Sequence, residues 1–154
     1  MIVYEGLFFD AETSKKICNL EPQKLDKRND LIHCTFKYHP TKEECFDNLI
    51  GFTFDIFIIG YGNDGNNSGF EVRLPDELNK YYINYYEENP TKLKPPHITV
   101  SLSEGANPTN TKNLKFIPLE EPIKITGKFG YWIKKDNKEY LSFDTFYSNN
   151  NLSN

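Results

Sequence analysis

Strands that follow one another across short turns constrain the fold of this chain more than any other feature. Residues 52–61 are strongly apolar, residues 62–68 are dense in glycine and asparagine, and residues 70–74 alternate between apolar and polar side chains. A second such pair of strands is predicted for residues 123–133 and 139–146. Strands joined in this way pair antiparallel. The pattern therefore predicts an α+β fold with antiparallel sheets, since strands and helices do not alternate regularly.

The remaining elements are predicted from the periodicity of the apolar residues. Strands are expected at residues 2–9, 31–38 and 97–102, and helices at residues 10–20, 41–49 and 76–88. The segments 21–30 and 103–115 have the composition of exposed loops. A strand and a helix precede His33, and a hairpin and a helix precede His97, which hints at an internal duplication. Residues 149–154 form a polar tail that we expect to be disordered.

Composition narrows the class of protein. Of the 154 residues, 38% are hydrophobic and 15% are aromatic, which excludes disorder for most of the chain. The formal net charge is -4, whereas proteins that follow long nucleic acids usually carry a basic excess. This balance favours a small ligand held in a pocket over a long nucleic acid held along a groove. No apolar run is long enough to cross a membrane, so no membrane partner is expected.

The cysteines indicate the compartment. Cys18, Cys34 and Cys45 are odd in number and lack paired spacing, which favours reduced thiols packed in the core of a cytoplasmic protein. The first residues show neither the basic start nor the apolar stretch of a secretory signal. The cysteines also lack ligand spacing and no His-Glu-x-x-His motif is present, so we expect no metal and no cofactor. We expect a monomer.

Two of the three histidines stand in the same short pattern, which reads His, any residue, Thr, hydrophobic. The two copies span residues 33–36 and 97–100. Because residues i and i+2 of a strand point to the same face, His33 and Thr35 are expected to share one face, which Lys37 extends. The residues between them are apolar and are expected to face the core.

The second copy repeats this arrangement, with His97, Thr99 and Ser101 on one face. Two imidazoles and two hydroxyls that face one cleft make a metal-free phosphodiester site. The ordinary histidine pKa allows one ring to be neutral and the other protonated near pH 7, so that one takes a proton and the other donates one. The threonine hydroxyls can donate to the non-bridging oxygens, and Lys37 is expected to add a positive charge there.

A single His-x-Thr pattern has little meaning, because a lone histidine in a strand is more often structural than catalytic. Two copies that use two of the three histidines, with matching alternation, favour a functional pair. Two alternatives stay open. One is a module that binds nucleotides without catalysis, and the other is a structural domain whose histidines are merely buried.

These two tetrads resemble those of the two-histidine (2H) phosphoesterases, the LigT-like group. That family has a bilobal α+β fold, in which two pseudo-symmetric lobes of antiparallel sheet with flanking helices each place one such motif in a central cleft. The resemblance implies a single domain over residues 1–148, divided into two lobes. It also implies catalytic roles for His33 and His97, and phosphate-binding roles for Thr35 and Thr99.

The family also suggests the reaction. Its members include cyclic phosphodiesterases that act on 2′,3′-cyclic phosphates, 2′-5′ RNA ligases, and viral enzymes that destroy 2′-5′ linked or cyclic oligonucleotide messengers. We therefore expect a metal-independent phosphodiesterase that cleaves a cyclic phosphate or a small oligonucleotide, in RNA end processing or in second-messenger degradation. The same residues would serve an RNA ligase that joins 2′,3′-cyclic ends, so this alternative stays open.

Three further features are interpreted structurally. His39, next to a proline, is expected at the rim of the site. Tyr38 lies opposite Lys37 in the alternation of its strand and is expected to pack in the core. The tyrosines within residues 81–85 form a stripe at helical spacing, which is also expected to be core.

Overall fold

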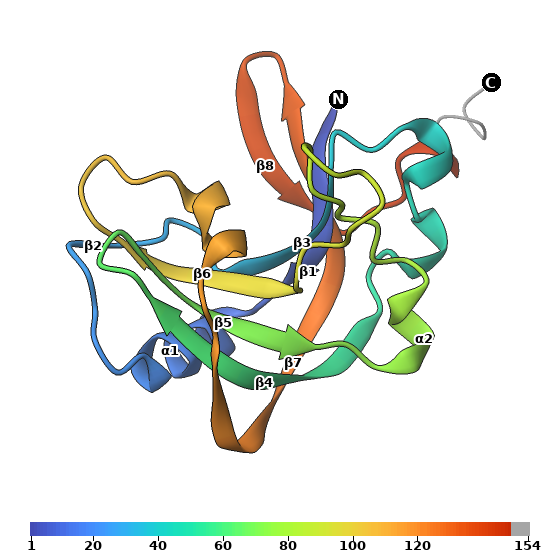
Figure 1. The fold of residues 1–154 in the computed structure, drawn as a ribbon. Helices are drawn as coiled ribbons and strands as arrows, with labels where there is room; N and C mark the ends of the chain where they lie inside the picture. Colours follow the sequence, from blue (N-terminus) through green and yellow to red (C-terminus); the bar gives the residue numbers. More distant parts are fainter. Residues whose placement is uncertain (149–154) are drawn as a thin grey trace.

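A single curved sheet makes up most of the fold (Figure 1). The computed structural model describes residues 1–148, and the tail predicted at 149–154 lies outside the described residues. The strands are β1 (Ile2–Phe8), β2 (Lys27–Arg28), β3 (His33–Tyr38), β4 (Thr53–Asn63), β5 (Asn67–Arg73), β6 (His97–Leu102), β7 (Ile117–Lys135) and β8 (Lys138–Ser142). The helices are α1 (Ala11–Leu20) and α2 (Asp76–Asn79), with the 3-10 helices η1 (Lys42–Glu44), η2 (Asp47–Leu49) and η3 (Pro108–Asn113).

Strands β4 and β7 pair at the middle of the sheet, and the others follow on either side. The order is β2-β6-β5-β4-β7-β1-β3, with β8 paired to β7, and these pairings are antiparallel. The sheet curves so far that β3 and β6, which belong to its opposite ends, contact each other without pairing (Figure 1). The predicted α+β class and the hairpins β4–β5 and β7–β8 are confirmed.

The core lies where the apolar sides of the strands face each other. Alternation along β3 buries Cys34 and Phe36, and alternation along β6 buries Ile98 and Val100. Helix α1 adds Ile17 to the same cluster. Burial of a large apolar side chain stabilises the fold by roughly 1.5–3 kcal/mol. The core therefore fixes one face of both strands, and the other face is left for polar side chains.

The helix predicted at 76–88 is wrong beyond its first turn. After α2 the chain follows an irregular course, in which the backbone N–H of Lys94 donates to the carbonyl of Asn84 (2.8 Å). The asparagine, isoleucine and tyrosine residues of this stretch are weak helix formers, so contacts with the rest of the fold decide its path. Tyr82 is buried as expected but Tyr85 is 39% exposed, so the tyrosine stripe is core only in part.

Other differences are smaller. The helix predicted at 41–49 forms the two 3-10 turns η1 and η2 instead of continuous α-helix. The loop predicted at 21–30 contains β2, which pairs with Ser101 and Leu102 of β6. The loop predicted at 103–115 contains η3. Strand β2 is too short to show a period, and the segment that contains η3 has no periodic apolar residues. Neither β2 nor η3 could therefore be predicted from the apolar pattern.

Candidate active site

A small pocket opens where β3 and β6 meet. It is lined by Asn29, His33, Thr35, Tyr38, Asn84, Lys94, His97, Thr99, Pro108 and Thr109. Its volume is about 30 Å³, which leaves room for one or two water molecules. A ligand can therefore place only a group of a few atoms inside, and the rest of it has to lie outside. Four of the six predicted site residues come together here.

Both imidazoles are held by the same kind of hydrogen bond. His33 Nδ1 lies 2.8 Å from the carbonyl oxygen of Leu31, and His97 Nδ1 lies 2.7 Å from that of Pro95. A carbonyl oxygen only accepts, so this bond assigns the proton to Nδ1 in each neutral ring. The lone pair of each Nε2 is then available. In both cases the acceptor precedes the histidine by two residues, so the same local geometry is repeated.

The two threonines occupy equivalent places. Thr35 and Thr99 are each 7% exposed, and both line the pocket on the same side as their histidines. The Thr99 hydroxyl donates to Thr111 Oγ1 (2.7 Å), which also accepts from the Asn67 side-chain amide (3.0 Å). A hydroxyl has one donor and two acceptor positions, so the bond from Thr99 fixes its orientation. The His-x-Thr pairs lie as strand alternation predicts.

A glycine stands opposite each threonine in the neighbouring strand. Gly6 of β1 pairs with Thr35, and Gly69 of β5 pairs with Thr99. A Cβ atom on Gly6 would lie 2.1 Å from the nearest carbonyl oxygen of β3, and one on Gly69 would lie 2.4 Å from the nearest carbonyl oxygen of β6. Only glycine allows this approach. In both strand pairs a β-bulge follows at once, so the two arms β1–β3 and β5–β6 share one construction.

The bulge changes which side chains face the pocket beyond each threonine. In β3 the register passes from Thr35 opposite Gly6 to Lys37 opposite Glu5, and one residue is skipped. Lys37 therefore does not line the pocket, and its charge acts on Glu5 instead. Tyr38 lines the pocket and is 37% exposed. The expected places of Lys37 in the site and of Tyr38 in the core are both wrong, because a bulge reverses the alternation.

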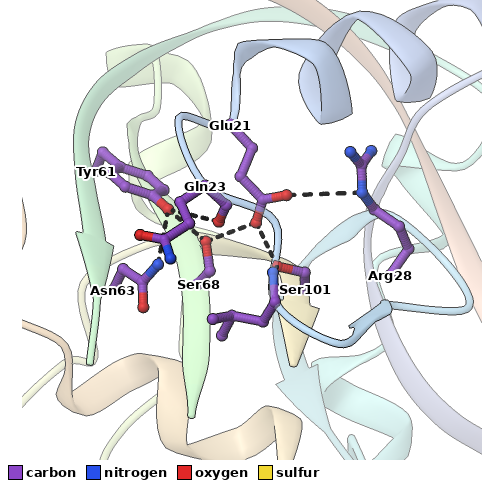
Figure 2. Close-up of polar contacts among 8 residues, drawn as sticks. Glu21, Gln23, Arg28, Tyr61, Asn63, Ser68 and Ser101 are labelled. Carbon is purple, nitrogen blue, oxygen red and sulfur yellow. Dashed lines mark hydrogen bonds and ion pairs between the residues drawn. The ribbon is translucent and has the colours of Figure 1, made fainter. Parts of the chain in front are cut away.

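Ser101 is turned away from the pocket by the equivalent bulge in β6. Figure 2 shows its hydroxyl donating to Glu21 Oε2 (2.5 Å), an atom that also accepts from the hydroxyl of Ser68 (2.6 Å). The Glu21 side chain is fully buried, and its other oxygen lies 3.6 Å from Arg28 Nε. Glu21 thus fastens its loop to β5 and β6, and Asn29 of that loop lines the pocket. Ser101 anchors this loop and does not line the pocket.

Lys94 brings a positive charge to the pocket, and no sequence pattern marks it. Its side chain is only 4% exposed, and its Nζ lies 3.0 Å from Glu87 Oε1. A buried ammonium group needs such a partner, because the loss of hydration is otherwise uncompensated. Lys94 stands three residues before His97, which strand alternation would place on the opposite face. Because a helix was wrongly expected at 76–88, the sequence also did not predict the loop that places Lys94 in the pocket. His39, in contrast, is exposed and does not line the pocket.

The histidines are less basic than usual. The pKa of His33 is lowered to about 4, mainly by burial and further by the nearby His97. Burial also lowers the pKa of His97, and Lys94 and Lys112 add to this effect. Tyr4 stacks on the His33 ring with centroids 4.8 Å apart and helps to exclude water. Both rings are therefore neutral near pH 7 without ligand, although the ordinary pKa suggested one protonated ring. An anion in the pocket would raise both pKa values.

No family model and no curated protein matches this sequence. Within residues 1–148, no group of three or more His, Cys, Asp or Glu side chains is arranged to hold a metal ion. None of the helices in that range is long and apolar enough to cross a membrane.

Proposed function

We propose that this chain is a two-histidine phosphodiesterase that cleaves a cyclic phosphate or a small oligonucleotide, cyclic or 2′-5′ linked. One observation carries the proposal. Two imidazoles, each tied through Nδ1 to a carbonyl two residues upstream, line one pocket, and each has a threonine beside it. Displacement at phosphorus needs two acid–base groups, because one proton leaves the attacking oxygen while another reaches the leaving oxygen.

The chemistry follows from the neutral rings. The Nε2 of one histidine accepts a proton from water, and the water oxygen forms a bond to phosphorus. The negative charge of the bound phosphate raises the pKa of the second ring, which takes up a proton and gives it to the leaving oxygen as the old P–O bond breaks. Thr35 and Lys94 stabilise the charge on the non-bridging oxygens, and the Thr99 hydroxyl joins them when it turns from Thr111 to the bound phosphate. Proton exchange with water then restores both rings.

The strand order supports the two-lobed fold that the resemblance implies. On one side of the central β4–β7 pair lie β5 and then β6, and on the other side lie β1 and then β3. Each outer arm carries a His-x-Thr unit opposite a glycine, followed by a bulge. We interpret each arm with its half of the sheet as one lobe of a single domain, and the pocket as the cleft between the lobes.

The thiols support the proposed compartment. Cys34 is buried in the core, and Cys18 and Cys45 pack against it half-buried. None of the three is paired in a disulfide within the described part of the chain, which suits a reducing compartment such as the cytoplasm. We propose a cytoplasmic monomer that acts on a small nucleotide substrate without a cofactor.

The test incubates the purified protein, in EDTA, with 2′,3′-cyclic nucleotides, 2′-5′ and 3′-5′ dinucleotides, and cyclic di- and trinucleotides. We expect one class to be cleaved. His33→Ala and His97→Ala should each lower the rate by about 10²–10⁴-fold. His39→Ala is the matched control, because it removes the one histidine outside the pocket, and it should leave the rate unchanged.

Three results would contradict the proposal. Tight binding of one compound by folded protein without cleavage would indicate a non-catalytic nucleotide-binding module. Joining of RNA 2′,3′-cyclic ends without hydrolysis would indicate a ligase. Loss of folding in both histidine variants, with no activity in the wild type, would indicate that the rings are structural.

A further inference from the structure

A second cavity, lined by two lysines, lies next to the pocket. We call it the lysine groove, and its lining includes Tyr86, Glu88, Lys92, Pro95, Lys112 and Asn113. Its volume is about 480 Å³, far more than that of the pocket. Pro95 joins the two, because this residue lines the groove while its carbonyl oxygen holds the His97 ring. The groove therefore begins directly beside one of the two proposed catalytic groups.

One carboxylate links the pocket to the lysine groove. Glu87 Oε1 lies 3.0 Å from Lys94 Nζ in the pocket, and Glu87 Oε2 lies 2.8 Å from Lys112 Nζ in the groove. The two lysine side chains are 4% and 13% exposed, whereas that of Glu87 is 68% exposed. Hydrogen bonds from Lys112 and then Lys94 lower the pKa of Glu87 to about 2. Two partly dehydrated ammonium groups thus flank one anionic group that solvent can reach.

The lysines of the groove are held in place before any ligand arrives. Lys92 Nζ and Lys112 Nζ lie 5.2 Å and 5.8 Å from the centroid of the Tyr86 ring. The Tyr86 hydroxyl donates to the carbonyl oxygen of Lys112 (3.1 Å). Side chains that are already ordered lose less entropy when they bind a ligand. Lys92, Lys94 and Lys112 outnumber Glu87 and Glu88. This region is therefore positive, although the net charge of the chain is -4.

We propose that the lysine groove binds a second phosphate of the substrate, next to the phosphate held in the pocket. The inference rests on the proposed function and narrows it: the substrate is an oligonucleotide with at least two phosphates, and not a nucleoside cyclic monophosphate. The second phosphate takes the place of the Glu87 carboxylate beside Lys112, and Glu87 turns into solvent. The pocket agrees with this inference, because its small volume leaves most of the ligand outside.

The test compares two nucleotides that differ by one phosphate. Adenosine 3′-monophosphate has one phosphate for the pocket, whereas adenosine 3′,5′-bisphosphate has a second for the groove. Calorimetric titration of the full chain at low salt should give a Kd for the bisphosphate that is about fivefold lower. This is the gain expected for one new partly exposed ion pair, with Lys92, because the contact with Lys112 replaces that of Glu87. This advantage should shrink as salt is raised, because lysine contacts to phosphate release counterions.

Two variants and a control locate the effect. Lys92→Gln and Lys112→Gln should each reduce the ratio of the two Kd values. Lys80→Gln is the matched control, because like Lys92→Gln it removes an exposed lysine over a tyrosine ring, here 5.2 Å from the Tyr81 centroid, but it lies outside both cavities. Equal affinity of the wild type for the two nucleotides would overturn the inference, and so would a ratio that neither groove variant changes.

The two proposals fail in different ways. If the chain cleaves no phosphodiester but binds the bisphosphate more tightly through Lys92 and Lys112, the phosphate site stands and the phosphodiesterase is wrong. If the chain cleaves nucleoside cyclic monophosphates as fast as matched oligonucleotides, and binds both test nucleotides equally, the phosphodiesterase stands and the second phosphate site is wrong.

Discussion

Replacement of Glu5 by glutamine should make the protein more stable at alkaline pH. The Glu5 side chain is fully buried in β1; its Oε1 accepts from the backbone N–H of Phe46 (3.3 Å), and its Oε2 has no partner. Burial raises the pKa of this carboxyl to about 8, and the negative charges of Glu44 and Asp47 add to the effect. At pH 5 the folded protein therefore holds Glu5 as a neutral acid.

The magnitude follows from the two pKa values. In the unfolded chain the carboxyl has its ordinary pKa of 4.5. Between pH 4.5 and pH 8 the unfolded chain has lost this proton while the folded chain keeps it, so the folded state loses stability as the pH rises. From pH 5 to pH 8 this loss amounts to about 3 kcal/mol. Glu5→Gln has no proton to lose and keeps an oxygen for Phe46.

Urea unfolding at pH 5 and pH 8, followed by circular dichroism, measures the effect. The free energy of unfolding of Glu5→Gln, relative to wild type, should rise by about 3 kcal/mol between the two pH values. Other groups titrate in both proteins, so the difference isolates Glu5. Glu12→Gln, at an exposed carboxyl of α1, is the matched control and should show no such rise. A difference between Glu5→Gln and wild type that stays constant from pH 5 to pH 8 would refute the reasoning.

Gly69→Ala should lower the free energy of unfolding by about 3 kcal/mol in a urea titration, because its Cβ would lie 2.4 Å from a carbonyl oxygen of β6; an equally stable variant would show that the strands can separate. Lys94→Met should lower kcat/KM for the proposed reaction by about 100-fold with little change in Tm, because an apolar chain replaces a buried charge; unchanged kinetics would remove Lys94 from the site. A further prediction concerns stability at acidic pH. Folded His33 stays neutral down to about pH 4 while the unfolded ring is protonated below 6.5, so stability falls by about 3 kcal/mol as the pH drops through this window. His33→Gln should lose this part of the acid sensitivity in urea titrations, and identical pH profiles would contradict the assignment.

It could be predicted that His33 and Thr35 share one face, because both belong to one strand, where alternation is a local property. The positions of Lys37 and Tyr38 could not be predicted, because the bulge that reverses their alternation accompanies the close approach of Gly6. That glycine belongs to another strand, and its effect depends on a pairing register that no local pattern reveals.

The position of Lys94 in the pocket could not be predicted for a different reason. The spacing of the tyrosines within residues 81–85 predicts a helix, and a helix would carry the chain past the site. Instead the chain turns back, so that Asn84 and Lys94 pair through their backbones and both line the pocket. Periodicity reports which residues are apolar, whereas this loop is shaped by hydrogen bonds between residues that have no periodic relation.

The two histidines come from strands near opposite ends of the hydrogen-bonded order, β3 and β6. The pocket between these strands is complete only when every strand between them has paired and the sheet has curved. Trp132, the only tryptophan, lies in β7 opposite Tyr4 of the arm β1–β3. Its fluorescence therefore follows the assembly of that arm, whereas recovery of ligand binding in the pocket follows completion of the whole sheet. Refolding should restore the tryptophan signal first and the binding site last.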